Sequence, residues 1–597
     1  MRLSFFIEQL HPIITLSNQL KPTIMKKILL LINVLVISSI NAQTVSKFLD
    51  VNQVKALVLN SSDMHWDLFG SGGPSYEVPV GSGHHADFTT GLWIGGYDQN
   101  GQLYTAAQTY RQDGMDFWPG PLDTTDATIT QNVSTQYDKI WKLNKADVSN
   151  FITNFSNGNV QSGSYVPAAD LVSWPAHGTG NNSKQLAPFV DVNNNGIYDP
   201  LIGGDYPKMK GDQMLYYIFN DNLNVHQASG GKRMGLEIHA TAYAYGASSV
   251  TSSYPYLDFT TFYNYKIINR SANDYSNVYL TLWTDADLGY YADDYIGCNV
   301  PNNFGYIYNA DNYDESAAGT SGYGSNIPAA GYQILKGPFA DLNDSKDNNN
   351  DGIYDESCEQ ALMNKFHYFN NNLAGVPLQT TDPQNSNQIY QYMSGSWKDN
   401  TPFTCGGNGY GGTISTDFVY PGNTYTNSPC GTAPWSEVTA GNTPSDRRYM
   451  MSSGPFTFEA GSEEVLEYAH CTSFDNTNPV AKLTSDMMNI RTFYNVFTPP
   501  NPCNNSNFSA AGVKEHLNTI DLKLYPNPTK DNLTISFKES FNQASVEIVD
   551  IIGKGLLSTQ AKNNTKIILN VSELPSGIYF AKITSDNKSI TKKFVKE

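Results

Sequence analysis

Apolar and polar residues alternate with a period of two along four short segments near the C-terminus, residues 533–537, 545–549, 566–569 and 579–583. Such alternation predicts half-buried β-strands, because successive side chains of a strand point to opposite faces of its sheet. Asn, Asp, Gly and Pro residues, which favour turns, separate the segments. Residues 521–597 are therefore predicted to form a small antiparallel, Ig-like β-sandwich of about seven strands.

Strand-like segments also recur through the region upstream, which we call the passenger. A turn at 98–101 is expected to join one hairpin, a turn at 270–274 a second pair of strands, and a turn at 460–462 a late hairpin. The segments are residues 88–97, 103–107, 213–219, 235–245, 259–269, 278–284, 455–458 and 464–469. This pattern predicts an all-β chain, in which β-sandwich passenger domains with long loops precede the small C-terminal sandwich.

One helix is predicted near the end of the passenger. Its apolar residues recur at spacings of three and four, which places them on one helical face, and Asn478 is suited to cap the first turn. The apolar stripe consists of Val480, Leu483, Met487, Ile490, Tyr494 and Phe497. We interpret this stripe as packing against the sandwich. A short helix is also expected near residues 145–147.

These patterns predict two β-rich passenger domains, residues 43–247 and residues 248–497, of which the second is closed by the helix. A linker rich in Pro, Asn and Ser follows at 498–520 and leads to the C-terminal segment 521–597. Residues 309–446 are rich in Gly, Asn and Ser and show few convincing strands. Loops of that length indicate a fastening such as disulfides or bound ions.

Met25 begins a pattern typical of a secretory signal peptide. Two lysines precede a mainly apolar run at 28–37, and a small-residue cleavage site ends at Ala42. The apolar run is shorter than the about 20 residues that a membrane-spanning helix requires. We therefore interpret residues 25–42 as the signal peptide and residues 1–24 as an over-long gene prediction.

The C-terminal segment combines several short motifs in a fixed order. Tyr-Pro-Asn-Pro is followed by D-x-x-G at Asp550 and Gly553, then by L-x-x-G-x-Y from Leu574, and the chain ends in a lysine-rich strand. In these motifs and their order, the segment resembles the type A C-terminal sorting domain of Bacteroidota type IX secretion substrates. The matching positions are Tyr525, Pro526, Asn527, Pro528, Gly577, Tyr579, Lys592 and Lys593.

The resemblance implies export to the periplasm, recognition by the type IX translocon and its sorting machinery, and removal of the tail. The product is then expected to be secreted or held at the outer cell surface. Passenger phrases at 91–96, 106–111 and 284–291 also resemble uncharacterised secreted proteins that carry the same sorting domain. That second resemblance implies no activity.

The chain carries a formal net charge of −19, and only 16% of its residues are charged. An acidic chain lacks the cationic surface that replaces counterions along a phosphate backbone, which excludes nucleic acid as a partner. Acidic character suits a protein that stays soluble outside the cell or binds hard cations. The six cysteines of this exported protein allow up to three disulfides. They are Cys298, Cys358, Cys405, Cys430, Cys471 and Cys503.

Two acidic loops, residues 191–199 and 347–355, share the pattern D-x-N-x-(N/D)-G-I-Y-D. Oxygen-bearing side chains at positions 1, 3, 5 and 9 and a glycine at position 6 match the first part of a calcium-binding EF-hand loop. At position 12, Ile202 and Cys358 replace the glutamate of that loop. Because the pattern occurs twice, we predict structural Ca²⁺; the alternative is two turns that bind nothing. The candidate ligands are Asp191, Asn193, Asn195, Asp199 and Asp205, and then Asp347, Asn349, Asp351 and Asp355.

Four carboxylates follow the strand predicted at 278–284, namely Asp285, Asp287, Asp293 and Asp294. They indicate either a third cation site, with Asp285 and Asp287 as ligands, or an acid/base pair for glycoside hydrolysis. A solvated acidic loop is the remaining alternative.

Aromatic residues in Gly- and Asp-rich contexts are candidates for stacking on sugars or partner proteins, or else they fill the core. They are Trp66, Tyr97, Tyr110, Phe117, Trp118 and Trp397. The histidines near acidic residues that are candidate ligands are His65, His84, His85 and His239, although a structural role is the commoner outcome for such histidines.

The first hypothesis for function is a non-catalytic structural or adhesive protein of the cell surface, with loops stabilised by Ca²⁺ and no catalytic residue assigned. The alternative is a carbohydrate-active or glycan-binding extracellular protein. The hydrolase motifs G-x-S-x-G and H-E-x-x-H are absent from the sequence. Surface glycans and other surface proteins are the partners that these hypotheses imply.

Overall fold

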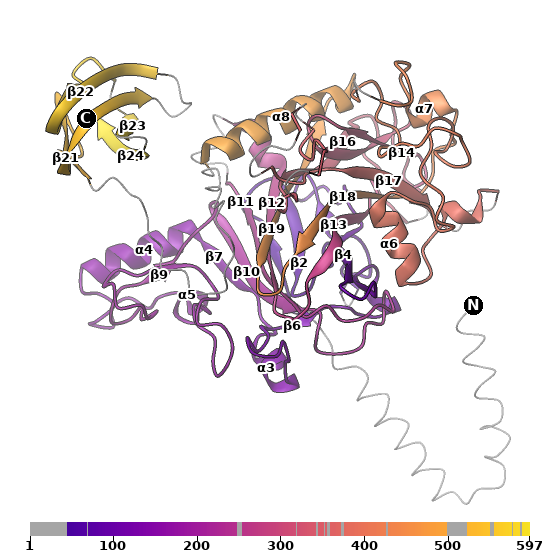
Figure 1. The fold of residues 1–597 in the computed structure, drawn as a ribbon, viewed down its shortest axis with the longest axis horizontal. Coiled ribbons are helices and arrows are strands. Elements are labelled where there is room, and N and C mark those ends of the chain that lie inside the picture. Colours follow the sequence, from indigo (N-terminus) through magenta and orange to yellow (C-terminus); the bar gives the residue numbers. More distant parts are fainter. Residues whose placement is uncertain are drawn as a thin grey trace, which may run out of the picture. The chain divides into compact units, whose positions relative to one another are not determined.

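The structure is a computed structural model, and it describes two stretches of the chain, residues 45–497 and 522–596 (Figure 1). Within these stretches, the residues not described are 69, 247–253, 318, 342–343, 351–352, 355–358, 372–374, 426–427, 550–554, 576 and 586–587. The predicted signal peptide, the segment 1–24 before it and the linker 498–520 lie outside the described residues. The chain divides into two compact units at Ile490 and Arg491.

The larger unit is built around a nine-stranded antiparallel sheet. Its central strands β10, β11, β12 and β19 lie side by side, and β16, β15 and β14 extend the sheet beyond β19 (Figure 1). Along β10 all eight residues are buried, so this strand is covered on both faces. In sheet order the strands are β14 (Asp294–Asn299), β15 (Phe304–Asn309), β16 (Pro328–Lys336), β19 (Glu463–Phe474), β12 (Thr260–Asn269), β11 (Leu236–Ala244), β10 (Gln213–Asn220) and β6 (Trp118–Pro119), with β7 (Trp141–Asn144) also paired to β10.

A five-stranded antiparallel sheet forms the second layer, and its central strand β13 carries the site described below. In order the strands are β17 (Lys365–Asn370), β18 (Arg447–Phe458), β13 (Tyr275–Asp285), β4 (Thr89–Asp98) and β5 (Leu103–Ala107). Smaller sheets consist of β1 (Ser46–Leu49), β2 (Lys55–Leu59) and β3 (Tyr76–Glu77), and of β8 (Phe189–Val190) and β9 (Tyr206–Pro207).

One continuous hydrophobic core contains side chains from both large sheets, which makes the unit a sandwich. Trp93 of β4 stacks on Trp283 of β13 with ring centroids 5.9 Å apart. Tyr263 of β12 stacks on Tyr468 of β19 at 5.1 Å. The predicted all-β sandwich class is thus confirmed.

The two layers are joined by connections that cross from one sheet to the other. β12 belongs to the nine-stranded sheet and β13 to the five-stranded sheet, so the turn at 270–274 does not close a hairpin. The same holds for β18 and β19 around the turn at 460–462. The side chain of Asn269 lies between these crossings and donates hydrogen bonds to the carbonyl oxygens of Asn273, Phe458 and Glu459. The late hairpin prediction is therefore wrong, although all four strands exist.

The predicted division of the passenger at residues 247 and 248 does not separate two compact units. Strand β11 pairs with β12 over eight residue pairs across this position, and β4 pairs with β13. Splitting the chain there would expose both large sheets along their lengths. The two halves instead share the sheets and the core, and the expected turn at 98–101 does join β4 to β5 as a hairpin.

The tract 309–446 contains more structure than its composition indicates. β16 pairs with β19 and β17 with β18, and α6 covers part of the smaller sheet. A disulfide joins Cys405 to Cys430 in this tract, whereas Cys298 and Cys471 are buried free thiols, so the six cysteines do not form three disulfides. The helices are α3 (Gln131–Gln136), α4 (Lys145–Ser156), α5 (Ala169–Val172), α6 (Ser386–Ser394), α7 (Glu437–Ala440) and α8 (Pro479–Phe497), with 3₁₀ turns η1 (Arg111–Asp113), η2 (Pro255–Phe259) and η3 (Leu378–Thr380).

The expected late helix is α8, and Asn478 caps it by accepting a hydrogen bond from the backbone N–H of Ala481. Leu483, Met487 and Ile490 of its stripe are fully buried. The expected short helix near residue 145 is α4. Both predictions are confirmed.

The smaller unit contains a separate five-stranded antiparallel sheet with its own core. Five strands form where about seven were expected, because β21 and β22 each continue through a register shift between Ser536 and Phe541. The strands are β20 (Leu522–Tyr525), β21 (Asn532–Val549), β22 (Gly555–Asn570), β23 (Gly577–Ser585) and β24 (Lys588–Lys596).

Candidate functional site

A pocket of about 230 Å³ opens at the end of β13. Asp285 is the last residue of β13, and Asp446 immediately precedes β18, the neighbouring strand. We call the pocket's aromatic lining residues, among which the rings of Trp66, Phe88 and Tyr110 lie 5.7–6.4 Å apart, the aromatic wall, and its carboxylates the charged wall. The lining residues are Trp66, Phe88, Tyr110, Gln112, Asp285, Asp287, Tyr291, Asp446 and Arg448.

The register of β13 and β18 places Asp285 directly opposite Arg448. The Nη2 atom of Arg448 lies 3.1 Å from the Oδ2 atom of Asp285, and only 3% of Asp285 is exposed. Arg448 also forms an ion pair with Asp446. A buried ion pair of this kind stabilises the site only while both partners are present, because either one alone would be an unpaired buried charge.

Tyr110 connects the aromatic wall to the charged wall. Its hydroxyl donates a hydrogen bond of 2.5 Å to the Oδ2 atom of Asp285 and accepts two from Arg448, at 3.0 and 2.7 Å. Its ring lies edge-on to Trp66 at 5.8 Å and to Trp283 at 5.3 Å. Burial and the negative charge of Asp285 raise the pKa of Tyr110 well above its usual value. The phenol therefore acts as a hydrogen-bond donor at neutral pH.

Two buried polar pairs hold the segments that supply the aromatic wall. The guanidinium of Arg111, next to Tyr110, binds both oxygens of Asp63 at 2.7 and 2.9 Å. His65, next to Trp66, lies 2.6 Å from Asp87, which precedes Phe88. Sequence reasoning treated His65 as a candidate ligand. Here it is fully buried, and its role is to position the loop that carries Trp66.

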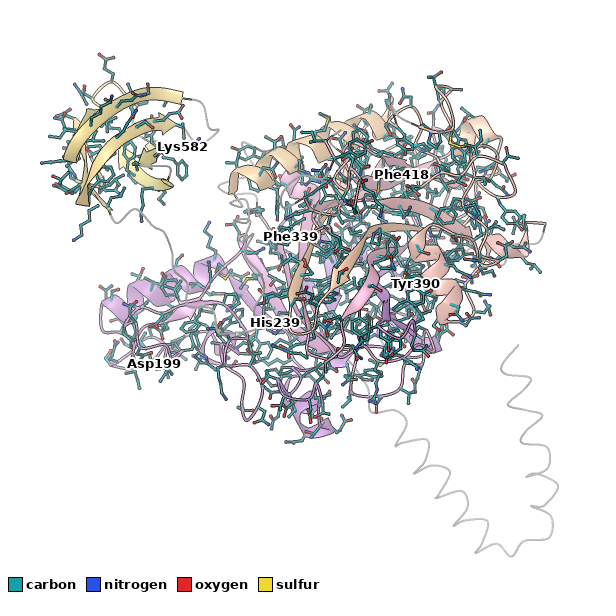
Figure 2. The ribbon with its side chains drawn as sticks, viewed as in Figure 1. Asp199, His239, Phe339, Tyr390, Phe418 and Lys582 are labelled. Carbon is teal, nitrogen blue, oxygen red and sulfur yellow. A yellow bond between two sulfur atoms is a disulfide. The ribbon has the colours of Figure 1, made fainter. Side chains whose placement is uncertain are left out.

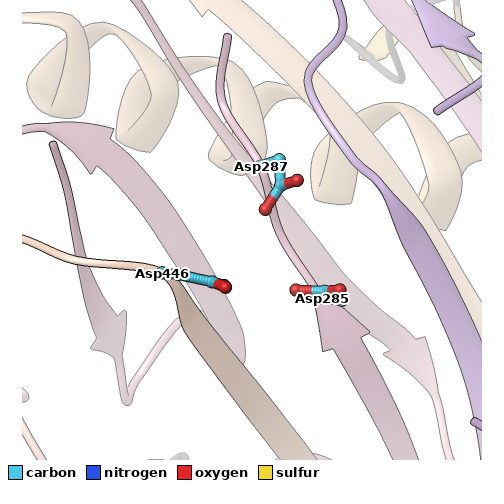
Figure 3. A group of neighbouring side chains, drawn as sticks. All are labelled: Asp285, Asp287 and Asp446. Carbon is cyan, nitrogen blue, oxygen red and sulfur yellow. The ribbon is translucent and has the colours of Figure 1, made fainter. Parts of the chain in front are cut away.

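Asp285, Asp287 and Asp446 point toward one another at the mouth of the pocket (Figure 3). One carboxylate oxygen from each lies within 4.8 Å of the other two. Burial raises the pKa of Asp285 to about 7, with Asp446 adding to the rise and Arg448 opposing it. The pKa of Asp287 is raised well above its usual value by burial and then by Asp285 and Asp446. Three carboxylates and one arginine leave the ionised cluster with an excess of negative charge.

The first predicted calcium loop is held together by hydrogen bonds from its own backbone. Buried Asp205 accepts from the N–H groups of Val192 and Asp199, at 2.8 and 2.9 Å. Asp191 accepts from the N–H groups of Asn195 and Gly196. Asp199, labelled in Figure 2, accepts from the side-chain amides of Asn193 and Asn195. The five predicted ligands are therefore linked by hydrogen bonds to one another or to the backbone of this loop.

The second loop adopts the same backbone turn at its fourth position. Asn350 has a φ of 63°, and Asn194 at the equivalent position of the first loop has a φ of 59°. The side chain of Asn350 donates to Asn303 and to the carbonyl oxygen of Met363, which fastens this loop to the sandwich. Asp347 and Asn349 lie in the described part of the loop, whereas the predicted ligands Asp351 and Asp355 lie outside the described residues.

The remaining candidates are divided between the core and a second acidic group. His239 is buried in the nine-stranded sheet, 2.7 Å from Glu237 (Figure 2). Phe117, Trp118 and Trp397 are buried in the interior. For these three residues the alternative interpretation, that the aromatic residues fill the core, holds. Asp293 and Asp294 lie at the start of β14, apart from the three-carboxylate cluster.

Sequence reasoning did not find Asp446, Arg448, Phe88 or Tyr291. Asp446 and Arg448 reach the site through strand pairing with β13, a long-range register that no local motif reveals. The signal that was present in the sequence is the pair of adjacent arginines, Arg447 and Arg448, in a chain with few charges.

In the C-terminal unit, the motif residues at the two ends of the sequence segment meet. Asn527 accepts a hydrogen bond of 2.8 Å from the backbone N–H of Val595, in the last strand. Tyr579 donates to the carbonyl oxygen of Pro575 at 2.8 Å and stacks on Phe594 at 5.7 Å. Of the expected positions, Tyr525 ends β20, Gly577 begins β23, and Lys592 and Lys593 lie in β24; Pro526 and Pro528 flank Asn527.

Residues 523–597 match the family model of the secretion system C-terminal sorting domain. The chain is thus a type IX secretion substrate, and it is exported to the cell surface or the extracellular space. The sorting domain implies an interaction with the type IX machinery. None of the described helices is long and apolar enough to cross a membrane.

Two further similarities concern proteins that act on polysaccharides. An endo-acting ulvan lyase of Formosa agariphila is 30% identical over 69 residues, which is 12% of this chain and 13% of that protein. A solved polysaccharide lyase aligns with 66% of this chain and 37% of its own at 7% identity, with a TM-score of 0.18. A structural likeness of that size carries no argument about fold or activity.

Proposed function

We propose that this exported protein binds glycans outside the cell through the pocket at the end of β13. The observation that carries the proposal is the junction of an aromatic wall with clustered carboxylates in one pocket. Aromatic rings pack against the apolar faces of sugars, while carboxylates accept hydrogen bonds from sugar hydroxyls. This proposal takes up the glycan-binding alternative of the sequence analysis, and glycan binding is one way in which a surface protein can be adhesive.

The size of the pocket favours one sugar residue of a longer chain. Its volume of about 230 Å³ lies below the roughly 300–1,000 Å³ typical of sites for drug-sized ligands. Tyr291 and Phe88 line the same pocket as Asp285 and Asp287, so a sugar ring that stacks on the aromatic residues would bring its hydroxyls toward these carboxylates.

The test is binding of purified full-length protein to a panel of soluble polysaccharides, followed by tryptophan fluorescence and by retention on glycan-loaded gels. Tyr291→Ala removes part of the aromatic wall and should weaken binding at least tenfold, about 1.4 kcal/mol. Tyr313→Ala is the matched control, because Tyr313 is 55% exposed and lies outside the pocket. Equal affinity of both variants and the wild type for every bound glycan would exclude this pocket as the site.

A second candidate function is polysaccharide cleavage at the same pocket. It is favoured by Asp285, whose pKa of about 7 suits a general acid or base near neutral pH. The similarity to an ulvan lyase is a second support, because that protein acts on a polysaccharide, although the similarity spans only 13% of that protein. Against cleavage by two carboxylates, the ligand oxygens lie within 4.8 Å, closer than the about 5–9.5 Å that separates the carboxyl pairs of glycosidases. Release of reducing or unsaturated ends by the wild type, and its loss in Asp285→Asn, would establish this activity.

We further propose that Ca²⁺ occupies the two Asp/Asn loops as a structural ion. The support is the recurrence of the pattern, the shared left-handed turn at Asn194 and Asn350, and the buried Asp205 that organises the first loop. Ions there would fasten two long connections without taking part in ligand binding.

A further inference from the structure

Asp285 and Asp287, which line the pocket, carry carboxylate oxygens that lack partners. Among the described residues, Asp287 makes no hydrogen bond or ion pair. The Oδ1 atom of Asp285 is buried and has no hydrogen-bond partner, whereas its Oδ2 atom is shared by Tyr110 and Arg448. A buried polar atom without a partner is destabilising, and a bound cation would supply the missing partner.

The arginine beside the cluster does not complete it. Arg448 directs Nη1 to Asp446, Nη2 to Asp285 and Tyr110, and Nε to Tyr110. The donor groups of Arg448 that face the cluster therefore already have acceptors, and none of them is bonded to Asp287. One positive charge stands against three carboxylates, which leaves an excess of two negative charges when all three are ionised.

We propose that Asp285, Asp287 and Asp446 bind a divalent cation, Ca²⁺, which completes the sugar pocket. Carboxylate oxygens alone favour a hard cation over zinc or copper. Two ligands on opposite sides of Ca²⁺ lie about 4.6–5.2 Å apart, since each Ca–O distance is about 2.3–2.6 Å. The three carboxylate oxygens lie within 4.8 Å of one another, so one ion of this size can contact all three.

The cation determines which sugars the pocket accepts, and this step rests on the proposed function. The Oδ2 atom of Asp285 already accepts from Tyr110 and Arg448, so the three carboxylates supply at most five of the 6–8 oxygens that Ca²⁺ takes. Coordination positions therefore remain for the hydroxyl or carboxylate oxygens of a sugar. Without the ion, the excess negative charge repels acidic sugars. With the ion, the charges of the site balance, and a sugar carboxylate can bind the metal while its ring stacks on the aromatic wall.

The test is calorimetric titration of the chelator-treated full-length protein with CaCl₂, without any sugar. The wild type should bind one more equivalent of Ca²⁺ than Asp287→Asn, or bind it at least tenfold more tightly at one site. Asp113→Asn is the matched control, because Asp113 is exposed, close in sequence to the pocket-lining Gln112, and outside the cluster. Unchanged stoichiometry and affinity in Asp287→Asn would overturn the proposal.

Two additions keep the result interpretable. Melting curves in chelator check that Asp287→Asn folds like the wild type, and Asp446→Asn provides an independent variant of the same cluster that should lose the same equivalent. Sugar binding is measured separately, with and without CaCl₂. Absence of sugar binding in both conditions would reject the glycan proposal while leaving the metal titration decisive for the cation.

Discussion

The hydroxyl of Tyr110 donates a hydrogen bond of 2.5 Å to the carboxylate of Asp285, a residue 175 positions further along the chain. Tyr110 follows β5, at the edge of the five-stranded sheet, while Asp285 ends the central strand β13. The strand β4 lies between them and pairs with both. The sandwich thereby brings the loop that carries Tyr110 and the end of β13 to one pocket. The contribution of the hydrogen bond between Tyr110 and Asp285 to stability can be measured.

Replacement of Tyr110 by Phe should lower the free energy of unfolding by about 1.5–3 kcal/mol. The substitution keeps the ring contacts with Trp66 and Trp283 but removes a hydrogen bond to a charged group and leaves Arg448 with one acceptor fewer. Urea unfolding followed by fluorescence provides the measurement. Tyr97→Phe is the control; with no hydrogen bond of its hydroxyl among the described contacts, it should change stability by less than about 0.5 kcal/mol. A loss no larger in Tyr110→Phe than in the control would show that the bond contributes nothing.

The buried His367 should make the passenger less stable in acid. His367 is fully buried among the rings of Tyr392 and Phe403, and burial lowers its pKa from 6.5 to about 3. Between these values the unfolded chain binds a proton that the folded chain does not, so the free energy of unfolding falls as the pH falls. The contribution to the slope is at most about 1.4 kcal/mol per pH unit.

The measurement is the free energy of unfolding of the wild type and of His367→Gln between pH 7 and the acid limit of refolding. The difference between the two proteins should shrink as the pH falls below 6.5, because the variant lacks the titrating ring. The same substitution at His84, which lies near the surface, is the control. Parallel curves for wild type and His367→Gln would contradict the argument.

Removal of calcium should destabilise the passenger through the first Asp/Asn loop. If Ca²⁺ binds the folded loop alone, a free concentration 100 times its Kd adds about 2.7 kcal/mol to the free energy of unfolding. Melting temperature measured with CaCl₂ and then with chelator should therefore fall in the wild type. In a double variant, Asp191→Asn with Asp199→Asn, the drop should be smaller, whereas Asp126→Asn in another surface turn should keep the full drop. A drop of equal size in all three proteins would remove this loop as a calcium site.

Local sequence patterns predicted most of the strands. They were least successful for strands whose side chains are small. Strand β16 reads Pro-Ala-Ala-Gly-Tyr-Gln-Ile-Leu-Lys, and its small residues resemble a loop although the strand is almost entirely buried. Those small side chains allow close approach, as at Gly331, where an added Cβ would lie 2.3 Å from the carbonyl oxygen of Gly305. The strand order, which places β12 and β13 in different sheets, depends on long-range packing that no turn motif encodes.

The candidate site was predicted in halves. The sequence indicated Asp285 and Asp287 as candidate cation ligands or an acid/base pair at the end of a strand. It indicated Trp66 and Tyr110 separately, as aromatic residues suited to stacking on sugars. Their union depends on β13 lying between β4 and β18, so only the fold shows that the two sets line one pocket. Asp446 was missed for the same reason.

In the sorting domain, Asn527→Ala should loosen the last strand. The side chain of Asn527 accepts a hydrogen bond from the backbone of Val595, and Thr529 donates its N–H to the carbonyl oxygen of the same residue. The first of these bonds joins the Tyr-Pro-Asn-Pro motif to the lysine-rich strand β24, so both motifs belong to one structural element. Loss of the side-chain acceptor should raise the hydrogen-exchange rate of the Val595 amide at least tenfold, because a backbone donor at the end of a strand then lacks its partner.

The amide of Ile583, inside β23, serves as an internal reference and should exchange as in the wild type. Asn570→Ala is the matched control variant, since Asn570 is an exposed asparagine at the end of β22, a strand that pairs with β21. If export depends on this joint, Asn527→Ala should also reduce the amount of protein at the cell surface, while Asn570→Ala should not. Normal export with a fast-exchanging Val595 would show that the translocon reads the motif residues without requiring a fixed last strand.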